Sequence, residues 1–252
     1  MSFTGKVVFI SGASSGIGAA AAIEFAKQDA DVVIIGRNEA KMNNVYKQCE
    51  AHGKKPLVIK ADISKDKEAK AAINKTIDKF GKLDILVNNA GIMRLGSILN
   101  GNLLESYDEV MSTNLRAVMH LTTLAAPHLI KTKGNIINIS SIGGDILPIL
   151  PEFVTYNVSK AALNHFTRCS ASELAGYGVR VNSISPGPVK TDFAENSGII
   201  DLITKANFTT PLNRMSDAVE VADLILYLSS DKAKGITGSN YVTDNGCLIA
   251  RK

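Results

Sequence analysis

Short apolar runs alternate with longer helical segments along this sequence, and that rhythm is what most constrains its fold. The runs are rich in β-branched residues and cover residues 7–10, 31–35, 56–60, 84–88, 135–140 and 179–185, with a weaker one at 240–243. The intervening segments with helical periodicity cover residues 16–28, 38–51, 66–80, 105–132, 155–176 and 217–229. Continuous apolar runs are typical of strands that are buried on both faces. The alternation therefore predicts an α/β fold, with a parallel sheet of about seven strands between two layers of helices.

Right-handed connections between such strands give a single-domain, Rossmann-like, doubly wound sheet that binds ligands at the carboxyl ends of its strands. The chain has 252 residues, of which 45% are hydrophobic and 21% are charged, and it contains no linker-like tract. One domain over residues 1–252 is therefore expected. Two irregular stretches, 143–154 and 187–216, each follow a strand. Because long irregular stretches in compact domains are often functional, both are predicted to be substrate loops over the ligand site.

Composition and charge argue against several classes of protein. The chain has 28 Lys and Arg residues and 24 Asp and Glu residues, and the net charge of +4 is too small to indicate nucleic-acid binding. No apolar run reaches the ~18 residues of a membrane span, and the run after Lys6 is too short for a signal peptide. The three cysteines are far apart and form no cluster with histidine. We therefore expect no metal site and a reducing, cytoplasmic setting.

A glycine-rich turn, SGASSGIG, directly follows the first predicted strand at residues 11–18. Gly12 allows a tight turn, Gly16 lets the backbone approach a diphosphate, and Gly18 allows close packing of helix on strand. The helix that begins near Gly16 offers unpaired N–H groups and the positive end of its dipole to a phosphate. The alternative is an ordinary strand–turn–helix connection, but the position before an amphipathic helix favours a dinucleotide site.

The second predicted strand ends at Ile35, and Gly36, Arg37 and Asn38 follow it. Dinucleotide folds that prefer NAD usually place an acidic residue near this point to hold the ribose 2′-hydroxyl. No acidic residue stands at 34–38. Arginine can hold a 2′-phosphate through two charge-assisted hydrogen bonds. The sequence therefore predicts that NADP(H) is preferred, with NAD(H) possible if Arg37 only stacks on adenine.

Tyr156 and Lys160 lie one turn apart in a predicted helix, so their side chains share a face. A nearby ammonium group favours the phenolate, and we expect it to lower the pKa of Tyr156 so that the phenol can exchange a proton with a carbonyl or an alcohol. Ser141 ends a predicted buried strand, and its hydroxyl is expected to donate to the same oxygen. Asn114 lies among apolar residues in a predicted helix. It is either a satisfied buried amide or a break in the helix that positions a water near Lys160.

Together these residues resemble the motifs of the short-chain dehydrogenase/reductase family, in the family's order and over essentially the whole chain. Residues 11–18 resemble its glycine-rich loop, with Ser11 in place of the usual Thr, and residues 88–91 form its NNAG motif. Ser141 is matched to the family's catalytic serine, which usually has a glycine three positions later, as Ser141 has in Gly144. The catalytic tetrad implied by the resemblance is Asn114, Ser141, Tyr156 and Lys160.

The resemblance also implies a nicotinamide cofactor and a homotetramer or homodimer. It places Asp62 near the adenine and Pro186, Gly187, Val189 and Thr191 beside the nicotinamide carboxamide. The full set of predicted cofactor-binding residues is Ser11, Gly12, Ser14, Ser15, Gly16, Ile17, Gly18, Arg37, Asn38, Asp62, Ile63, Asn89, Ala90, Gly91, Tyr156, Lys160, Pro186, Gly187, Val189 and Thr191.

The favoured function is an NADP(H)-dependent oxidoreductase that interconverts a carbonyl and a primary or secondary alcohol by hydride transfer, assisted by Ser141, Tyr156 and Lys160. The alternative is a non-catalytic dinucleotide-binding sensor or scaffold, which would not need the Ser, Tyr and Lys residues. A methyltransferase on the same sheet would have no use for the NNAG motif. An apolar substrate is predicted because the segments expected around the pocket are rich in large apolar residues. These are Ile92, Met93, Ile146, Leu147, Ile149, Leu150, Phe153, Phe193, Ile199, Ile200, Leu202, Ile203 and Phe208.

Overall fold

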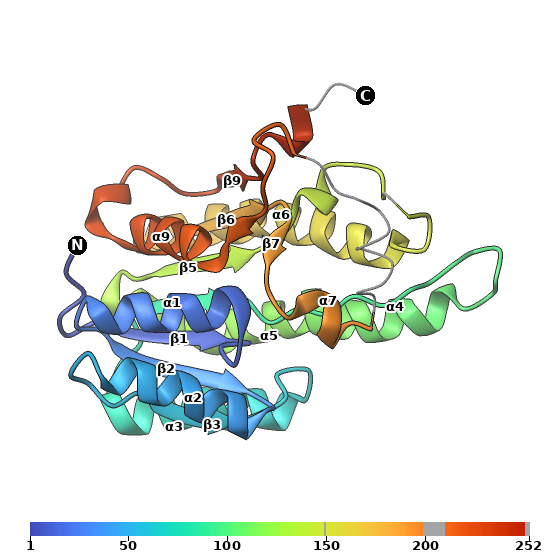
Figure 1. Cartoon of the computed structure of the whole chain (residues 1–252). Coiled ribbons are helices and arrows are strands. Elements are labelled where there is room, and N and C mark those ends of the chain that lie inside the picture. The colour runs from blue at the N-terminus through green and yellow to red at the C-terminus, as the bar shows by residue number, and fades with distance from the viewer. Residues whose placement is uncertain (149, 199–209, 250–252) are drawn as a thin grey trace.

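The computed structural model describes residues 1–148, 150–198 and 210–249. Its centre is a parallel sheet of seven strands in the order β3-β2-β1-β4-β5-β6-β9, with helices on both faces (Figure 1). The doubly wound α/β fold predicted from the alternation is confirmed. The strands are β1 (Val7–Ser11), β2 (Asp31–Gly36), β3 (Leu57–Lys60), β4 (Ile85–Asn88), β5 (Asn135–Ile139), β6 (Arg180–Pro186) and β9 (Asn240–Thr243).

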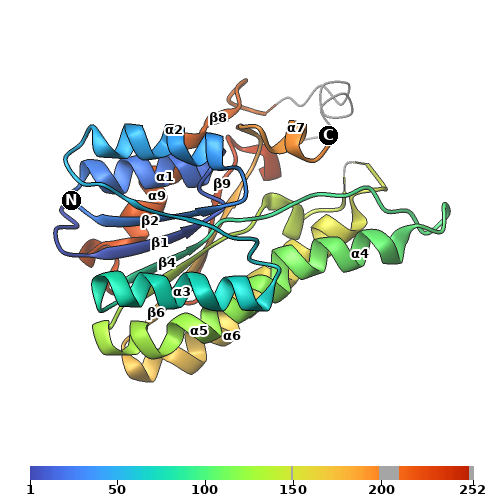
Figure 2. The same cartoon turned by 90° about the horizontal axis from the view of Figure 1, so that it is seen from below.

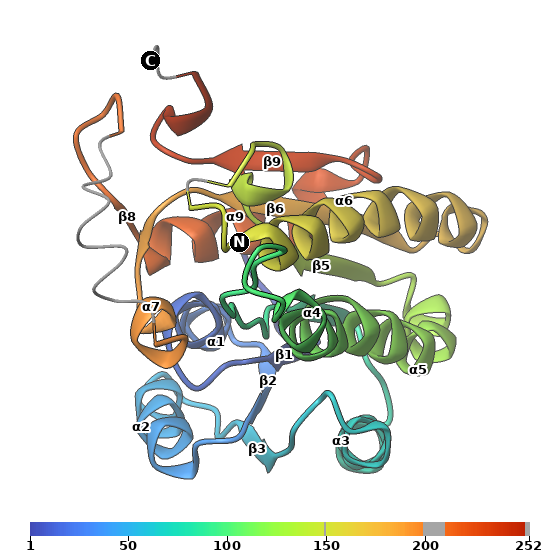
Figure 3. The ribbon, with the colours of Figure 1, turned by 90° about the vertical axis from the view of Figure 1, so that its right-hand side faces the viewer.

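Two hydrophobic cores lie on the two faces of the sheet, and successive residues of β1 point into opposite ones. Val8 and Ile10 belong to the core under α1 (Gly16–Lys27), α2 (Glu39–Glu50) and α9 (Ala218–Ser229). Phe9 belongs to the core under α3 (Asp66–Phe80), α5 (Ala117–Thr132) and α6 (Val154–Leu174). Figures 2 and 3 show these two helix layers on either side of the sheet. Burial on both faces explains why the strands are continuously apolar in the sequence.

The strand order reverses between β1 and β4, and this reversal determines where a ligand can bind. From β1 the chain adds β2 and β3 on one side, and from β4 it adds β5, β6 and β9 on the other. The connections leave the carboxyl ends of β1 and β4 in opposite directions, so a crevice opens there.

The long helix that the sequence predicts over residues 105–132 is interrupted in the structure. α4 covers Leu103–Met111, a π-helical turn covers Ser112–Arg116, and α5 follows from Ala117. The buried Asn114 lies in the π-helical turn. π-helical turns inside α-helices occur often at functional sites. The helix is thus interrupted at Asn114, whose amide is also buried and hydrogen-bonded, so both expected features are present. The water near Lys160 stays a prediction.

The irregular stretch 187–216 contains a two-stranded sheet that the sequence does not predict. β7 (Val189–Lys190) pairs in parallel with β8 (Ser216–Asp217), and a short helix, α7 (Phe193–Asn196), follows β7. Strands of two residues carry no periodicity, which is why pattern analysis misses them. The candidate pocket residues that lie outside the described residues are Ile149, Ile199, Ile200, Leu202, Ile203 and Phe208.

Within residues 1–148, 150–198 and 210–249, no helix is long and apolar enough to cross a membrane. In the same ranges, no group of three or more His, Cys, Asp or Glu residues comes together as a metal site.

Candidate active site

A cleft of about 1140 Å³ opens at the carboxyl ends of the strands, where the order of the sheet reverses. This volume exceeds the roughly 300–1,000 Å³ of pockets that hold small molecules. Every predicted catalytic or cofactor-binding residue lines the cleft except Ser11, Gly18 and Asn114. The cleft therefore has room for an extended ligand beside a small one, and the fold gathers at one place residues that are far apart in the sequence.

The glycine-rich turn forms a cradle that side chains would fill. Gly12 and Gly16 have φ angles of +66° and +56°, in the left-handed region that glycine adopts most readily. A Cβ atom on Gly12 would lie 2.7 Å from the Cα atom of Ala90, and one on Gly16 would lie 3.1 Å from the Thr191 side chain. α1 begins at Gly16, its first turn has no acidic residue, and the Ser15 side chain does not cap it. Its first N–H groups and its positive dipole end therefore remain available to a phosphate.

Ser11 and Gly18 stabilise this cradle from the side that faces away from the cleft. The Ser11 hydroxyl accepts hydrogen bonds from the N–H groups of Asn89 (3.0 Å) and Ala90 (3.2 Å) and donates to the carbonyl oxygen of Val87. The Asn89 amide donates to the carbonyl oxygens of Ser11 and Gly12, each at 3.0 Å. A Cβ atom on Gly18 would collide with this amide at 2.5 Å. These contacts lock the end of β1 to the end of β4, so Ser11 and Gly18 hold the cradle rather than face the cleft.

Arg37 extends over the end of the cleft at the tip of β2. Its side chain is 70% exposed, and one guanidinium nitrogen lies 3.9 Å from a carboxylate oxygen of Asp62. Burial raises the pKa of Asp62, but two hydrogen bonds from Ser64 and the charge of Arg37 outweigh this effect and lower the pKa. Asn38 caps α2 by accepting the N–H of Lys41 at 3.0 Å, which leaves its amide N–H groups for a ligand. Arg37 is thus held only loosely and can turn toward an anion.

Ser141, Tyr156 and Lys160 line the same cleft. The Ser141 hydroxyl accepts the N–H of Gly143 at 3.0 Å and hydrogen-bonds the Tyr156 phenol, so both hydroxyl groups meet where a ligand oxygen would bind. The ammonium group of Lys160 donates to the carbonyl oxygen of Ile139 at 2.9 Å and lies 5.6 Å from the centre of the Tyr156 ring. The Ser140 hydroxyl donates to the carbonyl oxygen of Lys160 at 3.2 Å. Ser140 is therefore used within the protein, which supports the choice of Ser141.

Burial changes the proton affinities of Tyr156 and Lys160. It raises the pKa of the Tyr156 phenol, and the Ser141 hydroxyl only partly opposes this rise. It lowers the pKa of Lys160 to about 8. The expectation that the ammonium group lowers the pKa of Tyr156 is wrong for the free protein, because loss of water around the phenol raises this pKa and the hydrogen bond with Ser141 offsets only part of the rise.

The depressed pKa of Lys160 predicts that its charge destabilises the fold. Between about pH 8 and the ordinary value of 10.5 the unfolded chain binds this proton and the folded chain does not, so folding stability rises with pH across this window. Lys160→Met should therefore gain at most about 3 kcal/mol over the wild type at pH 7, less what the lost hydrogen bond to Ile139 costs. Urea unfolding at pH 7 and pH 10 should show that the stability advantage of Lys160→Met over the wild type becomes smaller at pH 10. A difference that does not change with pH would contradict this prediction.

Asn114 connects the site to the segment that follows β4. Its side-chain oxygen accepts the N–H of Ile92 at 2.8 Å, and its amide donates to the carbonyl oxygen of Ile92 at 2.9 Å and to the Ser159 hydroxyl at 3.1 Å. Ser159 in turn donates to the carbonyl oxygen of Tyr156 at 2.7 Å. Asn114 therefore lies behind the cleft wall and holds the turn of α6 that carries Tyr156 and Lys160.

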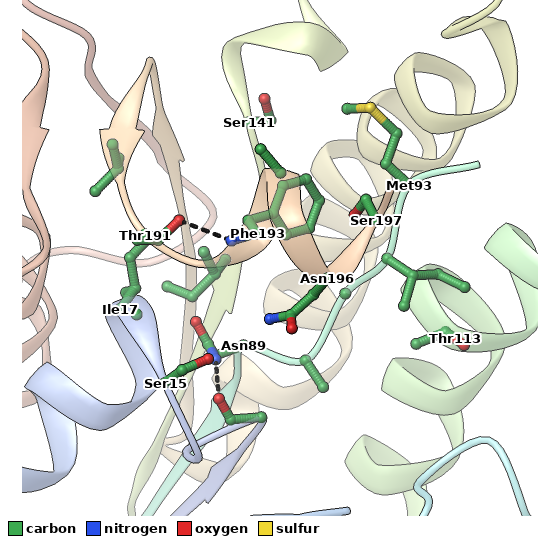
Figure 4. A pocket seen from close by; sticks show the side chains of 18 of the residues that line it. Ser15, Ile17, Asn89, Met93, Thr113, Ser141, Thr191, Phe193, Asn196 and Ser197 are labelled. Carbon is green, nitrogen blue, oxygen red and sulfur yellow. Dashed lines mark hydrogen bonds between the residues drawn. The ribbon is translucent and has the colours of Figure 1, made fainter. Parts of the chain in front are cut away.

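An apolar cluster forms the part of the cleft around Tyr156. Met93 and Phe153 are buried, and Leu150, Phe193 and Ala194 pack against them together with Tyr156. The rings of Tyr156 and Phe193 lie 5.9 Å apart at an angle of 52°. Figure 4 shows Met93, Ser141 and Phe193 in one part of the pocket and Ser15, Ile17, Asn89 and Thr191 in another. The cleft thus combines an apolar part with a phosphate-binding part.

Comparisons with known proteins agree with this geometry. Residues 12–247 match the family model described as Enoyl-(Acyl carrier protein) reductase. The crystal structure of a short-chain type dehydrogenase/reductase from Mycobacterium marinum is 32% identical, with a TM-score of 0.93 over 99% of this chain and 98% of that chain. The chain belongs to the short-chain dehydrogenase/reductase family. It is therefore an oxidoreductase, and the family's nicotinamide dinucleotide fits the cradle that a Cβ atom on Gly12 or Gly16 would fill.

Two curated relatives show the range of this dehydrogenase/reductase family. The 3-oxoacyl-[acyl-carrier-protein] reductase FabG of Thermotoga maritima is 34% identical over 99% of this chain and 100% of its own length. An A-factor type gamma-butyrolactone 1'-reductase (1S-forming) of Streptomyces virginiae is 34% identical over 98% of this chain and 96% of its own. Both of these relatives are named as reductases.

One feature of the site of this dehydrogenase/reductase is not predicted by its sequence. Lys41 lines the cleft and forms an ion pair with Asp192, which lies between the lining residues Thr191 and Phe193. Lys41 and Asp192 are 151 residues apart, so no spacing rule could have paired them. The only signal in the sequence was that Lys41 lies one turn after Asn38.

Proposed function

We propose that this chain is an NADP(H)-dependent oxidoreductase that interconverts a lipophilic carbonyl compound and its primary or secondary alcohol. The observation that carries the proposal is the Ser141 hydroxyl, which accepts the N–H of Gly143 and hydrogen-bonds the Tyr156 phenol. It shares a cleft with the Tyr156 phenol and the phosphate cradle. The nicotinamide dinucleotide supplies or accepts the hydride when it is bound.

The side chains of this chain perform the proton chemistry. In reduction, Ser141 donates a hydrogen bond to the carbonyl oxygen, and Tyr156 transfers its phenolic proton to that oxygen as it becomes an alcohol. The raised pKa of Tyr156 keeps the phenol protonated for this step. The Lys160 ammonium group, which the Ile139 carbonyl oxygen holds near the ring, then stabilises the phenolate. Asn114 holds the α6 turn that presents both groups. In oxidation the same proton moves back.

The apolar cluster supports a lipophilic substrate. Met93, Phe153 and Phe193 surround the Tyr156 ring and offer no charge to a ligand. Two cations that line the cleft already have carboxylate partners: Arg94 pairs with Glu109 at 2.7 Å and Lys190 with Asp217 at 3.1 Å. An apolar wall with its charges paired favours an uncharged ketone or aldehyde over an acid.

The test is to mix the purified protein with NADPH and a panel of carbonyl compounds and to follow the loss of NADPH absorbance. The panel contains lipophilic ketones and matched keto acids of similar size. Turnover of the lipophilic members supports the proposal. If the protein binds NADPH but turns over no carbonyl and no alcohol, the non-catalytic sensor or scaffold is the better assignment.

The proposal includes a homotetramer or homodimer. Apolar side chains lie exposed on the helices of one face: Leu104 (73%), Tyr107 (44%), Met119 (43%) and Val158 (52%). Burying them between copies of the chain would give a symmetric interface. Light scattering at micromolar concentration should show a dimer or larger assembly for the wild type. Met119→Glu should give smaller species, because the interface would have to bury the new carboxylate. A wild-type monomer would refute this part.

A cytoplasmic location is also part of the proposal. Cys49, Cys169 and Cys247 are all free thiols, as is usual for proteins in a reducing compartment.

A further inference from the structure

One ion pair joins the two walls of the cleft. The ammonium nitrogen of Lys41, in the first turns of α2, lies 2.6 Å from a carboxylate oxygen of Asp192, which precedes α7. Lys41 lines the cleft, and Asp192 lies between Thr191 and Phe193, which both line it. Figures 2 and 3 show α7 beside α2, although the two helices are far apart in the sequence. The pair therefore connects the wall that carries Arg37 and Asn38 with the wall that begins the substrate loop.

The neighbours of Asp192 connect this pair to both parts of the site. Thr191 lies against the phosphate cradle, because a Cβ atom on Gly16 would be 3.1 Å from its side chain. Phe193 lies on the other side of Asp192 and packs beside Tyr156 in the apolar cluster. The segment 191–193 thus runs from the phosphate-binding part of the cleft to the apolar part, and Lys41 is its ionic attachment to α2.

The charges around Lys41 keep this attachment ionised. The hydrogen bond with Asp192 raises the pKa of Lys41, and the charge of Glu195 adds to the rise. The two side chains are 39% and 41% exposed, so solvent can reach the pair and break it without unfolding the protein. Without Lys41, the carboxylates of Asp192 and Glu195 would stand unpaired close to a site built for phosphates.

We propose that Lys41 and Asp192 form a clasp that retains the dinucleotide, so that the pair must break before the dinucleotide leaves. This inference rests on the proposed function, since it assumes that the cleft binds a nicotinamide dinucleotide. Lys41 and Asp192 are positioning residues: they act by holding segment 191–193 against α2. Because Phe193 belongs to that segment, opening the clasp also loosens the wall of the substrate site.

The test is the rate at which NADPH leaves the full-length protein, measured by its fluorescence after rapid mixing with excess NADP⁺. The proteins are the wild type, Lys41→Met, Asp192→Asn and the double variant. Exposed ion pairs contribute little, so each single variant should release NADPH about two- to fivefold faster than the wild type. The double variant should be no faster than the singles, because either change already breaks the pair. Lys55→Met, which breaks a surface pair with Glu50 away from the cleft, is the matched control and should match the wild type.

Three results would overturn the clasp, and they are distinguishable. If Lys41→Met speeds release while Asp192→Asn slows it, the two residues act only through their charges on the phosphates. If both variants bind NADPH and release it at the wild-type rate, the pair has no role in retention, and the proposed function still stands. If the wild type binds neither NADPH nor NADH, the proposed function fails, and the clasp fails with it.

Discussion

Tyr156→Phe should bind NADPH as the wild type does and lose about two or more orders of magnitude in kcat, which is the scale of lost general acid catalysis. Phenylalanine keeps the ring that packs 5.9 Å from Phe193 and removes only the hydroxyl. The Tyr156 side chain is half-buried and its phenol has a raised pKa, so the variant removes an uncharged hydroxyl and should leave the fold intact. The measurements are kcat with a carbonyl substrate from the panel and the dissociation constant for NADPH from fluorescence.

Tyr46→Phe is the matched control for this variant. Tyr46 donates a hydrogen bond to Glu50 on α2 at 3.4 Å and does not line the cleft, so the control removes a phenol without touching the site. It should keep wild-type turnover. Near-normal turnover in Tyr156→Phe would mean that another group moves the proton. Weakened NADPH binding in that variant would mean that Tyr156 acts mainly on the cofactor.

The sheet and its helix layers could be predicted because each strand is buried on both faces. A residue such as Phe9 or Ile10 has a core to enter on either side, so the strands appear as unbroken apolar runs of the right length. The break at residues 112–116 was visible only as an Asn among apolar residues. β7 and β8 were not predicted, since two residues are too few for any pattern to appear.

The positions of the candidate site residues could be predicted because parallel strands bring their carboxyl ends to one edge of the sheet. Motifs that follow β1, β2, β4, β5 and β6 therefore meet, whatever their distance in the sequence. The chemistry of the individual groups was harder to predict. The rise in the pKa of Tyr156 depends on how much water the fold removes, and the pair of Lys41 with Asp192 depends on how the chain crosses the cleft. Neither the pKa shift nor the ion pair can be predicted from the spacing of residues in the sequence.

Arg37→Ala should reduce the preference for NADPH over NADH, measured as the ratio of kcat/KM values, by about 10- to 150-fold. This range corresponds to the roughly 1.5–3 kcal/mol of a charge-assisted hydrogen bond. We expect Arg37 to be the largest single contributor, because the one carboxylate that it pairs with among the described residues, Asp62, lies at 3.9 Å and holds it weakly. Glu39 also lines the cleft, but it pairs with Lys60 at 3.2 Å, which reduces its repulsion of a phosphate.

The exposure of Arg37 places the expected effect toward the lower end of that range. At 70% exposure, water and salt screen the guanidinium, so the ratio should also fall when ionic strength rises, and more in the wild type than in the variant. Arg168→Ala, an exposed arginine on α6 away from the cleft, is the control and should leave the ratio unchanged. If the wild type uses NADPH and NADH equally well, or if Arg37→Ala leaves the ratio unchanged, Arg37 does no more than stack on adenine. The absence of an acidic residue at 34–38 would then allow NADP(H) to bind without making it preferred over NAD(H).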